Sequence, residues 1–350
     1  MAREGEPTTK GGWDEELMRY GEEKFTLLKG CEGFGDRLQC LLQAIEYCKK
    51  TERTLIVDWE DEHWCHEERK GFDYYFSISG LKQIDLDDFR AITKEQGITS
   101  IYPKQWESRL TRPSKTEENY KSELTGENRN KIWSEITKGE RPDIEETIAV
   151  QSGTGYRSFN IETMKLMGVK QWLKSYIRQH GAANNLIYET YNCVHLRGCS
   201  KPFMGTENDD TNYNIKMTKT WPTLNAYLTS VHNAYSEIEP KDKEIPTYII
   251  TDNRKLGEAW EKRFKTGIVI EQSCELFEKS GIHMISREKN RANGLRKETI
   301  MMETIRDFNI IMNAKNIIND GLSLFSVMAA KAAIADIQLV RLNAGENGKN

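Results

Sequence analysis

Short apolar runs alternate with helical stretches along most of the chain, and this alternation constrains its fold more than any other feature. The apolar run Phe25–Gly30 leads into the glycine-rich turn CEGFGD, and a second apolar run follows at Arg53–Trp59. Between the two runs, apolar residues recur at near-helical spacing, at Leu38, Leu41, Leu42, Ile45 and Tyr47. Strand, glycine turn, helix and strand in this order predict the opening of an α/β domain.

The second half of the chain repeats the alternation more regularly. We predict strands at residues 188–196, 247–252, 267–270 and 316–320, and helices at residues 221–236, 254–264, 298–313 and 323–334. This order favours a second parallel sheet, with a boundary near Gly181 after the helix that carries Trp172. We therefore expect an α/β protein of two Rossmann-like domains, residues 1–182 and 183–340, that face a central cleft.

Residues 104–146 interrupt the pattern, because the stretch SKTEENYKSELTGENRNK is nearly devoid of aliphatic side chains. We interpret this segment as a polar excursion from the first domain rather than as part of its core. A solvated surface of helix and loop is the simpler interpretation. The alternative is a segment that closes over an acceptor.

Charge and composition exclude several classes of protein. Fifty Lys and Arg residues against 54 Asp and Glu residues do not fit a strongly basic nucleic-acid-binding protein. No apolar run approaches the ~20 residues that cross a bilayer, and the N-terminal residues lack the apolar stretch of a signal peptide. Seven cysteines without regular spacing fit a reduced protein. We expect a soluble, cytoplasmic protein, and no pattern indicates its oligomeric state.

In parallel α/β sheets, ligands bind at the carboxyl ends of the strands, which directs attention to four places in this sequence. The first is the turn around Gly33, Gly35 and Asp36. Glycines there allow positive φ and a close approach of the backbone to a ligand, and the following helix offers free N–H groups to an anion. A tight turn with a purely structural role explains the same residues.

The second place is the segment VHLRGCSK, in which His195 and Arg197 leave one strand on the same side. Arg197 can bind a pyrophosphate, and Lys201 adds a second positive charge. The third place is Asp252, at the end of TYIITD. Its residue type and position favour the N-cap of the helix that starts at Arg254, whereas a carboxylate could also accept two hydrogen bonds from guanine.

The fourth place is the segment NDGLSLFS, where a strand ends and a helix starts. The Ser323 hydroxyl could cap the helix, and the same hydroxyl with the free amides near Phe325 and Ser326 could hold a phosphate. The two roles are compatible.

Several other polar clusters have simpler explanations. His63, Cys65 and His66 lack the second pair of ligands that a zinc site requires. The acidic clusters Asp85–Asp88 and Asp209–Asp210 are typical of solvated surface, so we assign no metal. Cys31 and Cys199 have no partner in a nucleophile motif.

Taken together, the four places resemble the GDP-fucose-dependent fucosyltransferases of the α1,6 type, which include the rhizobial nodulation fucosyltransferase, and the related protein O-fucosyltransferases. Residues 30–59 are similar to the glycine-rich N-terminal region of that family, and VHLRGCSK is similar to its H-x-R-x-x-D-K motif. Residues 247–260 and 313–333 resemble the second and third motifs of the family. The resemblance implies a GT-B fold with the nucleotide sugar mainly in the C-terminal domain.

The resemblance also implies roles for individual residues. His195 and Asp252 would contact guanine, and Arg197 would bind the β-phosphate of the donor. Ser323, Phe325 and Ser326 would lie at the phosphate-binding turn, while Gly33 and Gly35 would shape the cleft from the other side.

The catalytic machinery follows from the same motifs. Lys201 matches the Lys of the first motif, but the Asp of that motif is Ser200 here and its second Arg is Gly198. Glu207, in a G-T-E segment, matches a carboxylate that is a proposed base in relatives, and Asp36 is a second carboxylate that could take the proton of the acceptor. The expected activity is inverting transfer of fucose from GDP-fucose to a glycan or other hydroxyl acceptor, without a metal or other cofactor.

Two other interpretations stay open at this point. Because two positions of the first motif differ, the chain could be a GT-B glycosyltransferase that uses another nucleotide sugar. A nucleotide- or glycan-binding module without catalysis is the non-enzymatic alternative. Measuring which nucleotide stabilises the protein distinguishes these interpretations.

Overall fold

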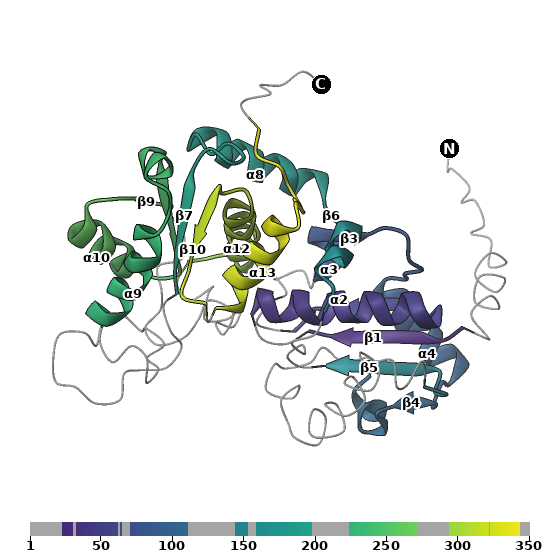
Figure 1. Cartoon of the computed structure of the whole chain (residues 1–350). Coiled ribbons are helices and arrows are strands. Elements are labelled where there is room, and N and C mark those ends of the chain that lie inside the picture. Colours follow the sequence, from purple (N-terminus) through teal and green to yellow (C-terminus); the bar gives the residue numbers. More distant parts are fainter. Residues whose placement is uncertain are drawn as a thin grey trace, which may run out of the picture.

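The computed structural model describes residues 23–30, 33–61, 64, 71–110, 144–152, 159–197, 224–271, 294–321 and 323–343. Two four-stranded sheets, both entirely parallel, form its framework, one from each half of the chain (Figure 1). The prediction of two parallel α/β sheets is therefore confirmed. None of the described helices is at once long enough and apolar enough to cross a bilayer.

The N-terminal sheet has the strand order β2-β1-β5-β4. Its strands are β1 (Phe25–Lys29), β2 (Thr54–Asp58), β4 (Ile101–Tyr102) and β5 (Ile148–Ser152). Because successive side chains of a strand point to opposite faces, Leu28 packs toward the helix α2 (Phe34–Thr51), whereas Leu27 packs with Phe89 of α4 (Leu86–Gln96). A short antiparallel pair, β3 (Phe76–Ile78) and β6 (Met167–Val169), lies beside this layer, after the short helix α3 (Phe72–Tyr75).

The C-terminal sheet has the strand order β10-β7-β8-β9. Its strands are β7 (Asn192–Leu196), β8 (Thr247–Thr251), β9 (Ile268–Val269) and β10 (Asn316–Ile318). Helices α9 (Leu224–Ser236) and α10 (Arg254–Phe264) pack on one face, and α12 (Lys297–Met312) packs on the other. The half also contains α8 (Gln171–Ala183), which precedes β7, and α13 (Leu324–Ile334), which follows β10.

The predicted helices and strands mostly match the structure within a few residues, but the interpretation of residues 104–146 is wrong at both ends of that segment. A 3-10 helix, η1 (Lys104–Arg109), carries the fully buried Trp106, and Leu110 and Ile144 are also buried. The next strand, β5, lies between β1 and β4 inside the sheet. Residues 111–143 of the excursion lie outside the described residues. The predicted boundary at Gly181 falls within α8, which continues to Ala183; the division into domains 1–182 and 183–340 stays a prediction.

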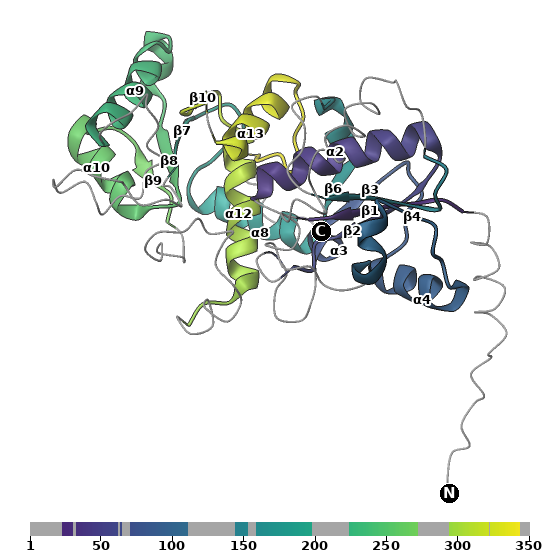
Figure 2. The same cartoon turned by 90° about the horizontal axis from the view of Figure 1, so that it is seen from below.

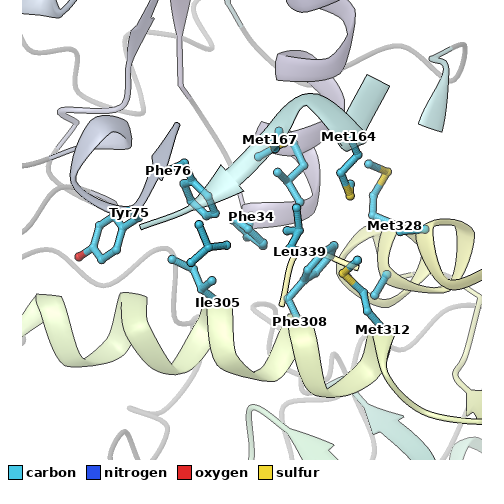
Figure 3. Packing of buried hydrophobic residues seen from close by; sticks show 14 of the residues in the cluster. Phe34, Tyr75, Phe76, Met164, Met167, Ile305, Phe308, Met312, Met328 and Leu339 are labelled. Carbon is cyan, nitrogen blue, oxygen red and sulfur yellow. The ribbon is translucent and has the colours of Figure 1, made fainter. Parts of the chain in front are cut away.

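One of the apolar clusters contains buried residues of both halves and joins them. Phe34, in the first turn of α2, lies between aromatic rings of both halves (Figure 3). Its ring stacks on Trp64 with 5.4 Å between centroids, and its edge meets Phe308 of α12 at 5.1 Å. Phe34 therefore fixes the start of α2 against helices of the C-terminal half.

Candidate functional site

The strand order brings the predicted site residues of the C-terminal half to one edge of one sheet. Strands β10, β7 and β8 are neighbours and run parallel, so their carboxyl ends meet. Asp320, Arg197 and Asp252 follow these strands within one or two residues. This edge lies next to the start of α13 and the start of α2, as Figures 1 and 2 show from two directions.

Arg197 and Asp252 form an ion pair through Nη1 of the guanidinium and Oδ2 of the carboxylate. The Asp252 side chain is only 6% exposed, whereas that of Arg197 is 26% exposed. The other guanidinium N–H groups make no hydrogen bond within the part of the chain that the structure describes. Asp252 thus orients an arginine that keeps further donors for an anion.

Asp252 does not cap the helix that follows it, so that prediction is wrong by one residue. Asn253 occupies the N-cap position of α10, and its side-chain oxygen accepts a hydrogen bond from the Leu256 N–H at 3.2 Å. The Asn253 N–H in turn donates to the hydroxyl of Thr251 at 3.0 Å. The side-chain amide of Asn253 thus caps the helix, and the Asp252 carboxylate pairs with Arg197.

His195 is buried one strand residue before the edge, against the ring of Phe325 at 5.6 Å between centroids. Burial, with the positive charge of Arg197 as a smaller cause, lowers the pKa of His195 to about 3, so its imidazole is neutral at physiological pH. Its Nδ1 atom has no hydrogen-bond partner among the described residues. A neutral imidazole with an unused ring nitrogen can hydrogen-bond a base but adds no charge to hold a phosphate.

The turn between β10 and α13 is held by its own polar side chains. Asp320 Oδ1 accepts a hydrogen bond from the Ser323 N–H at 3.1 Å, and Asn319 Oδ1 accepts one from the Gly321 N–H at 2.7 Å. Gly321 has a φ of +68°, a conformation that a glycine adopts without strain. These hydrogen bonds tie the residues that follow β10 to the start of α13.

Ser323 stands at the N-cap position of α13, but its hydroxyl makes no capping hydrogen bond. Ser323 therefore occupies the cap position that the sequence suggests, without the side-chain hydrogen bond of a cap. Ser326, one turn further on, donates its hydroxyl to the Ser323 carbonyl at 3.3 Å. Ser323, Phe325 and Ser326 thus lie at or within the first turn of α13, at a helix start that attracts anions.

The glycine-rich turn approaches from the N-terminal half, and Gly35 acts there by its small size rather than by its φ. Gly33 is the N-cap of α2 with a φ of −73°, so the expected positive φ is absent there. A Cβ on Gly35 would lie 2.6 Å from the carbonyl carbon of Leu324 and 2.7 Å from the Phe325 nitrogen. Gly35 therefore lets the start of α2 pack directly on the start of α13. Asp36 follows in the same turn and is half-buried.

The facing edge of the N-terminal sheet contains two buried ion pairs. Lys29 Nζ and Asp58 Oδ2 lie 2.5 Å apart at the ends of β1 and β2, and Arg37 donates to both carboxylate oxygens of Asp61 at 2.7 and 3.0 Å. Their side chains are at most 2% exposed. Because separating a buried charge from its partner is costly, these two ion pairs hold their side chains in place at this edge.

Sequence reasoning missed Tyr227, which contacts the edge from α9. Its hydroxyl accepts a hydrogen bond from the backbone N–H of Arg197 at 2.9 Å. The helical spacing of Leu224, Tyr227, Leu228 and Val231 indicates a buried face, but no sequence signal gives the partner of one hydroxyl group.

Other predicted residues lie outside the described residues: Gly198, Ser200, Lys201 and Glu207 of the first motif region, the cysteines Cys31 and Cys199, the acidic pair Asp209–Asp210, and the cluster of His63, Cys65 and His66. Asp85, treated above as solvated surface, caps α4 by accepting the Asp88 N–H at 2.8 Å. Within the described ranges, no group of three or more His, Cys, Asp or Glu side chains is arranged to hold a metal ion.

Comparison with solved structures identifies the fold. NodZ α-1,6-fucosyltransferase co-crystallised with GDP is similar at a TM-score of 0.59 and 17% identity, over 88% of this chain and 92% of that chain. NodZ from Bradyrhizobium is similar at 0.59 and 15% identity, over 88% and 93% of the two chains. The apo form of POFUT1 is similar at 0.51 and 12% identity, over 90% and 97%.

These likenesses confirm the predicted fold class: the chain has the GT-B, fucosyltransferase-like fold. At such low identities they show the fold alone. No family model and no curated protein matches the chain in sequence.

Proposed function

We propose that the protein is a glycosyltransferase that transfers L-fucose from GDP-fucose, with inversion, to a hydroxyl group of a glycan or related acceptor. The observation that carries the proposal is the Arg197–Asp252 pair at the ends of adjacent strands, beside the start of α13. NodZ, with which the chain shares its fold, has been crystallised with GDP and soaked with GDP-fucose.

In this proposal, the donor lies along the edge of the C-terminal sheet. The outward N–H groups of Arg197 and the first amides of α13, near Ser323 and Ser326, would bind the diphosphate. His195, whose buried ring packs against Phe325, and Asp252 would lie near guanine, and Phe325 would complete this side of the site. Asp252 would hold one edge of the guanidinium while the β-phosphate binds another.

The chemistry requires charge stabilisation at the departing diphosphate. Glycosyl transfer passes through an oxocarbenium-like transition state, and negative charge develops on the leaving group as the glycosidic bond breaks. Arg197 and the α13 amides are pre-oriented donors of the kind that stabilise such charge without a metal, with Lys201 as a further cation. Asp36 or Glu207 would take the proton of the acceptor hydroxyl.

A panel of nucleotides tests the donor. We expect GDP to raise the melting temperature, and UDP, CMP and ADP to leave it unchanged. A preference for UDP would instead indicate a glycosyltransferase with another nucleotide sugar. Donor hydrolysis or transfer to a glycan array then distinguishes an enzyme from a binding module, and stabilisation by none of the nucleotides would overturn the proposal.

Replacement of Arg197 tests its role in catalysis. Arg197→Ala should lower kcat/KM for GDP-fucose by at least ~100-fold, because it removes a donor to the leaving diphosphate. Arg263→Ala is the matched control: this arginine donates to Asn225 and Thr229 on the outer side of α9 and α10. Near-normal turnover of Arg197→Ala would remove Arg197 from the mechanism.

A further inference from the structure

The hydroxyl of Tyr227 lies where three elements of the proposed donor site meet. It accepts the backbone N–H of Arg197 at 2.9 Å, immediately after β7. It also donates to Oδ2 of Asp320 at 3.5 Å, directly beyond the end of β10. Tyr227 is 1% exposed and belongs to the apolar face of α9, which packs against Val194 and Ile249 of the sheet.

Asp320 extends this link to the start of α13. Its second carboxylate oxygen, Oδ1, accepts the Ser323 N–H at 3.1 Å. A chain of hydrogen bonds therefore runs from Arg197 N–H through the Tyr227 hydroxyl and the Asp320 carboxylate to the Ser323 N–H. It connects the two groups proposed to bind the diphosphate, which are the arginine and the helix start.

The two ends of Arg197 are thus held separately. Tyr227 binds its backbone, and Asp252 binds its guanidinium. Burial and the charge of Asp320 raise the pKa of Tyr227 well above its usual range, so the phenol keeps the proton that it donates to Asp320. A phenylalanine could fill the same space but could make neither hydrogen bond.

We infer that Tyr227 is a positioning residue, which sets the distance between Arg197 and the phosphate-binding turn and does so through Asp320. This inference rests on the proposed GDP-sugar function. Tyr227 need not touch the donor, because its effect passes through the two groups that bind the β-phosphate. The consequence is specific: the loss of its hydroxyl should weaken recognition of the β-phosphate and leave recognition of guanosine intact.

The test compares GDP with GMP, which lacks the β-phosphate. In calorimetric titrations of the full chain, Tyr227→Phe should weaken GDP binding about tenfold, a typical effect of losing a hydrogen bond to a charged network, and should change GMP binding less than about twofold. A role in stability alone would lower the melting temperature and leave the ratio of the two affinities unchanged.

Tyr235→Phe is the matched control on the same helix. Tyr235 is also buried, but its hydroxyl lies 3.3 Å from Thr247 Oγ1 and 3.4 Å from Thr266 Oγ1, at the amino end of β8. Its loss should leave the preference for GDP over GMP unchanged. An unchanged preference in Tyr227→Phe, or an equal loss of GDP and GMP binding, would overturn the inference.

Asp320→Ala provides an independent variant. If Asp320 were only a negative charge beside the diphosphate, its removal would tighten GDP binding, because a repulsion disappears. A positioning role through the Ser323 N–H requires weaker GDP binding and unchanged GMP binding. If the unaltered protein binds neither nucleotide, the proposed function itself fails, and this outcome is distinct from an unchanged ratio in the variants.

Discussion

At the scale of single residues, the environment of His195 leads to a prediction about pH. The folded protein holds this imidazole neutral, with a pKa of about 3, whereas an unfolded chain protonates histidine near pH 6.5. Below pH 6.5 the unfolded state therefore binds one more proton at this residue than the folded state does. Folding stability consequently falls as the pH falls from 6.5 toward 3.

We expect His195→Gln to reduce this dependence. Between pH 5.5 and 4.5, the decline in the free energy of unfolding should be smaller than in the unaltered protein by about 1.4 kcal/mol per pH unit, which is the contribution of one proton. Urea unfolding curves at several pH values measure it. His180, with its pKa lowered by burial to about 4, contributes to the slope of both proteins. Equal slopes would mean that His195 carries a proton in the folded protein.

At the scale of elements, the contact between the first turns of α2 and α13 depends on Gly35. In most helices, a change from Gly to Ala stabilises by up to about 1 kcal/mol. Here the new Cβ would lie within 2.7 Å of the α13 backbone, so we expect Gly35→Ala to destabilise by about 1–3 kcal/mol. We also expect weaker GDP binding, since α13 would shift. Chemical denaturation and calorimetry measure the two effects.

Gly321→Ala is the comparison for this prediction. An added Cβ there meets nothing within 4 Å, but the φ of +68° makes the substitution cost about 1 kcal/mol. Gly35→Ala tests steric overlap between the helix starts, whereas Gly321→Ala tests backbone strain in the turn before α13. Stabilisation by Gly35→Ala would show that the two helix starts are not in contact in solution.

The sequence predicts the elements well where apolar periodicity is strong, as in α10, whose predicted and observed bounds coincide at residues 254–264. It fails where burial depends on distant partners. Trp106 lies in a polar stretch but packs with Leu27 and Ile56 of the sheet, and the strand β5 (Ile148–Ser152) begins just after the same polar stretch, residues 104–146. Such contacts are tertiary, and local periodicity does not contain them.

In the candidate site, too, the sequence predicts positions in the chain but not tertiary contacts. Residue type and position after strands predict His195, Arg197, Asp252 and Ser323 as site residues, and the strand order brings the ends of their strands together. Which of two neighbouring polar side chains caps a helix depends on the local backbone and side-chain geometry, so the roles of Asp252 and Asn253 could not be separated in advance. Tyr227 belongs to the same class: its burial is predictable and its partner is not.

At the scale of the whole molecule, the shared core predicts how the protein unfolds. Phe34 contacts Trp64 and Phe76 in one half and Phe308 and Phe325 in the other. Proteins of this size often unfold in separate steps, but here each half loses core contacts if the other opens. We therefore expect β1 and β7 to lose amide protection together during denaturation.

Phe34→Ala should lower the free energy of unfolding by about 3–5 kcal/mol. The amides of β1 and of β7 should then both lose protection at a lower denaturant concentration. Hydrogen exchange measured by mass spectrometry follows β1 and β7 peptides separately. A shift confined to β1 would contradict the prediction, because it would mean that the halves unfold independently.

The same core has a consequence for how a nucleotide bound at the proposed site would leave. Each 100 Å² of apolar surface exposed to water costs about 2.5 kcal/mol, so a hinge opening that separated Phe34 from Phe308 and Phe325 would be slow and rarely populated. A nucleotide at the edge beside Arg197 would therefore exchange while the two sheets keep their relative orientation. The off-rate of GDP would then be governed by contacts within a few ångströms of it, and turnover limited by product release would respond to single side chains at the edge.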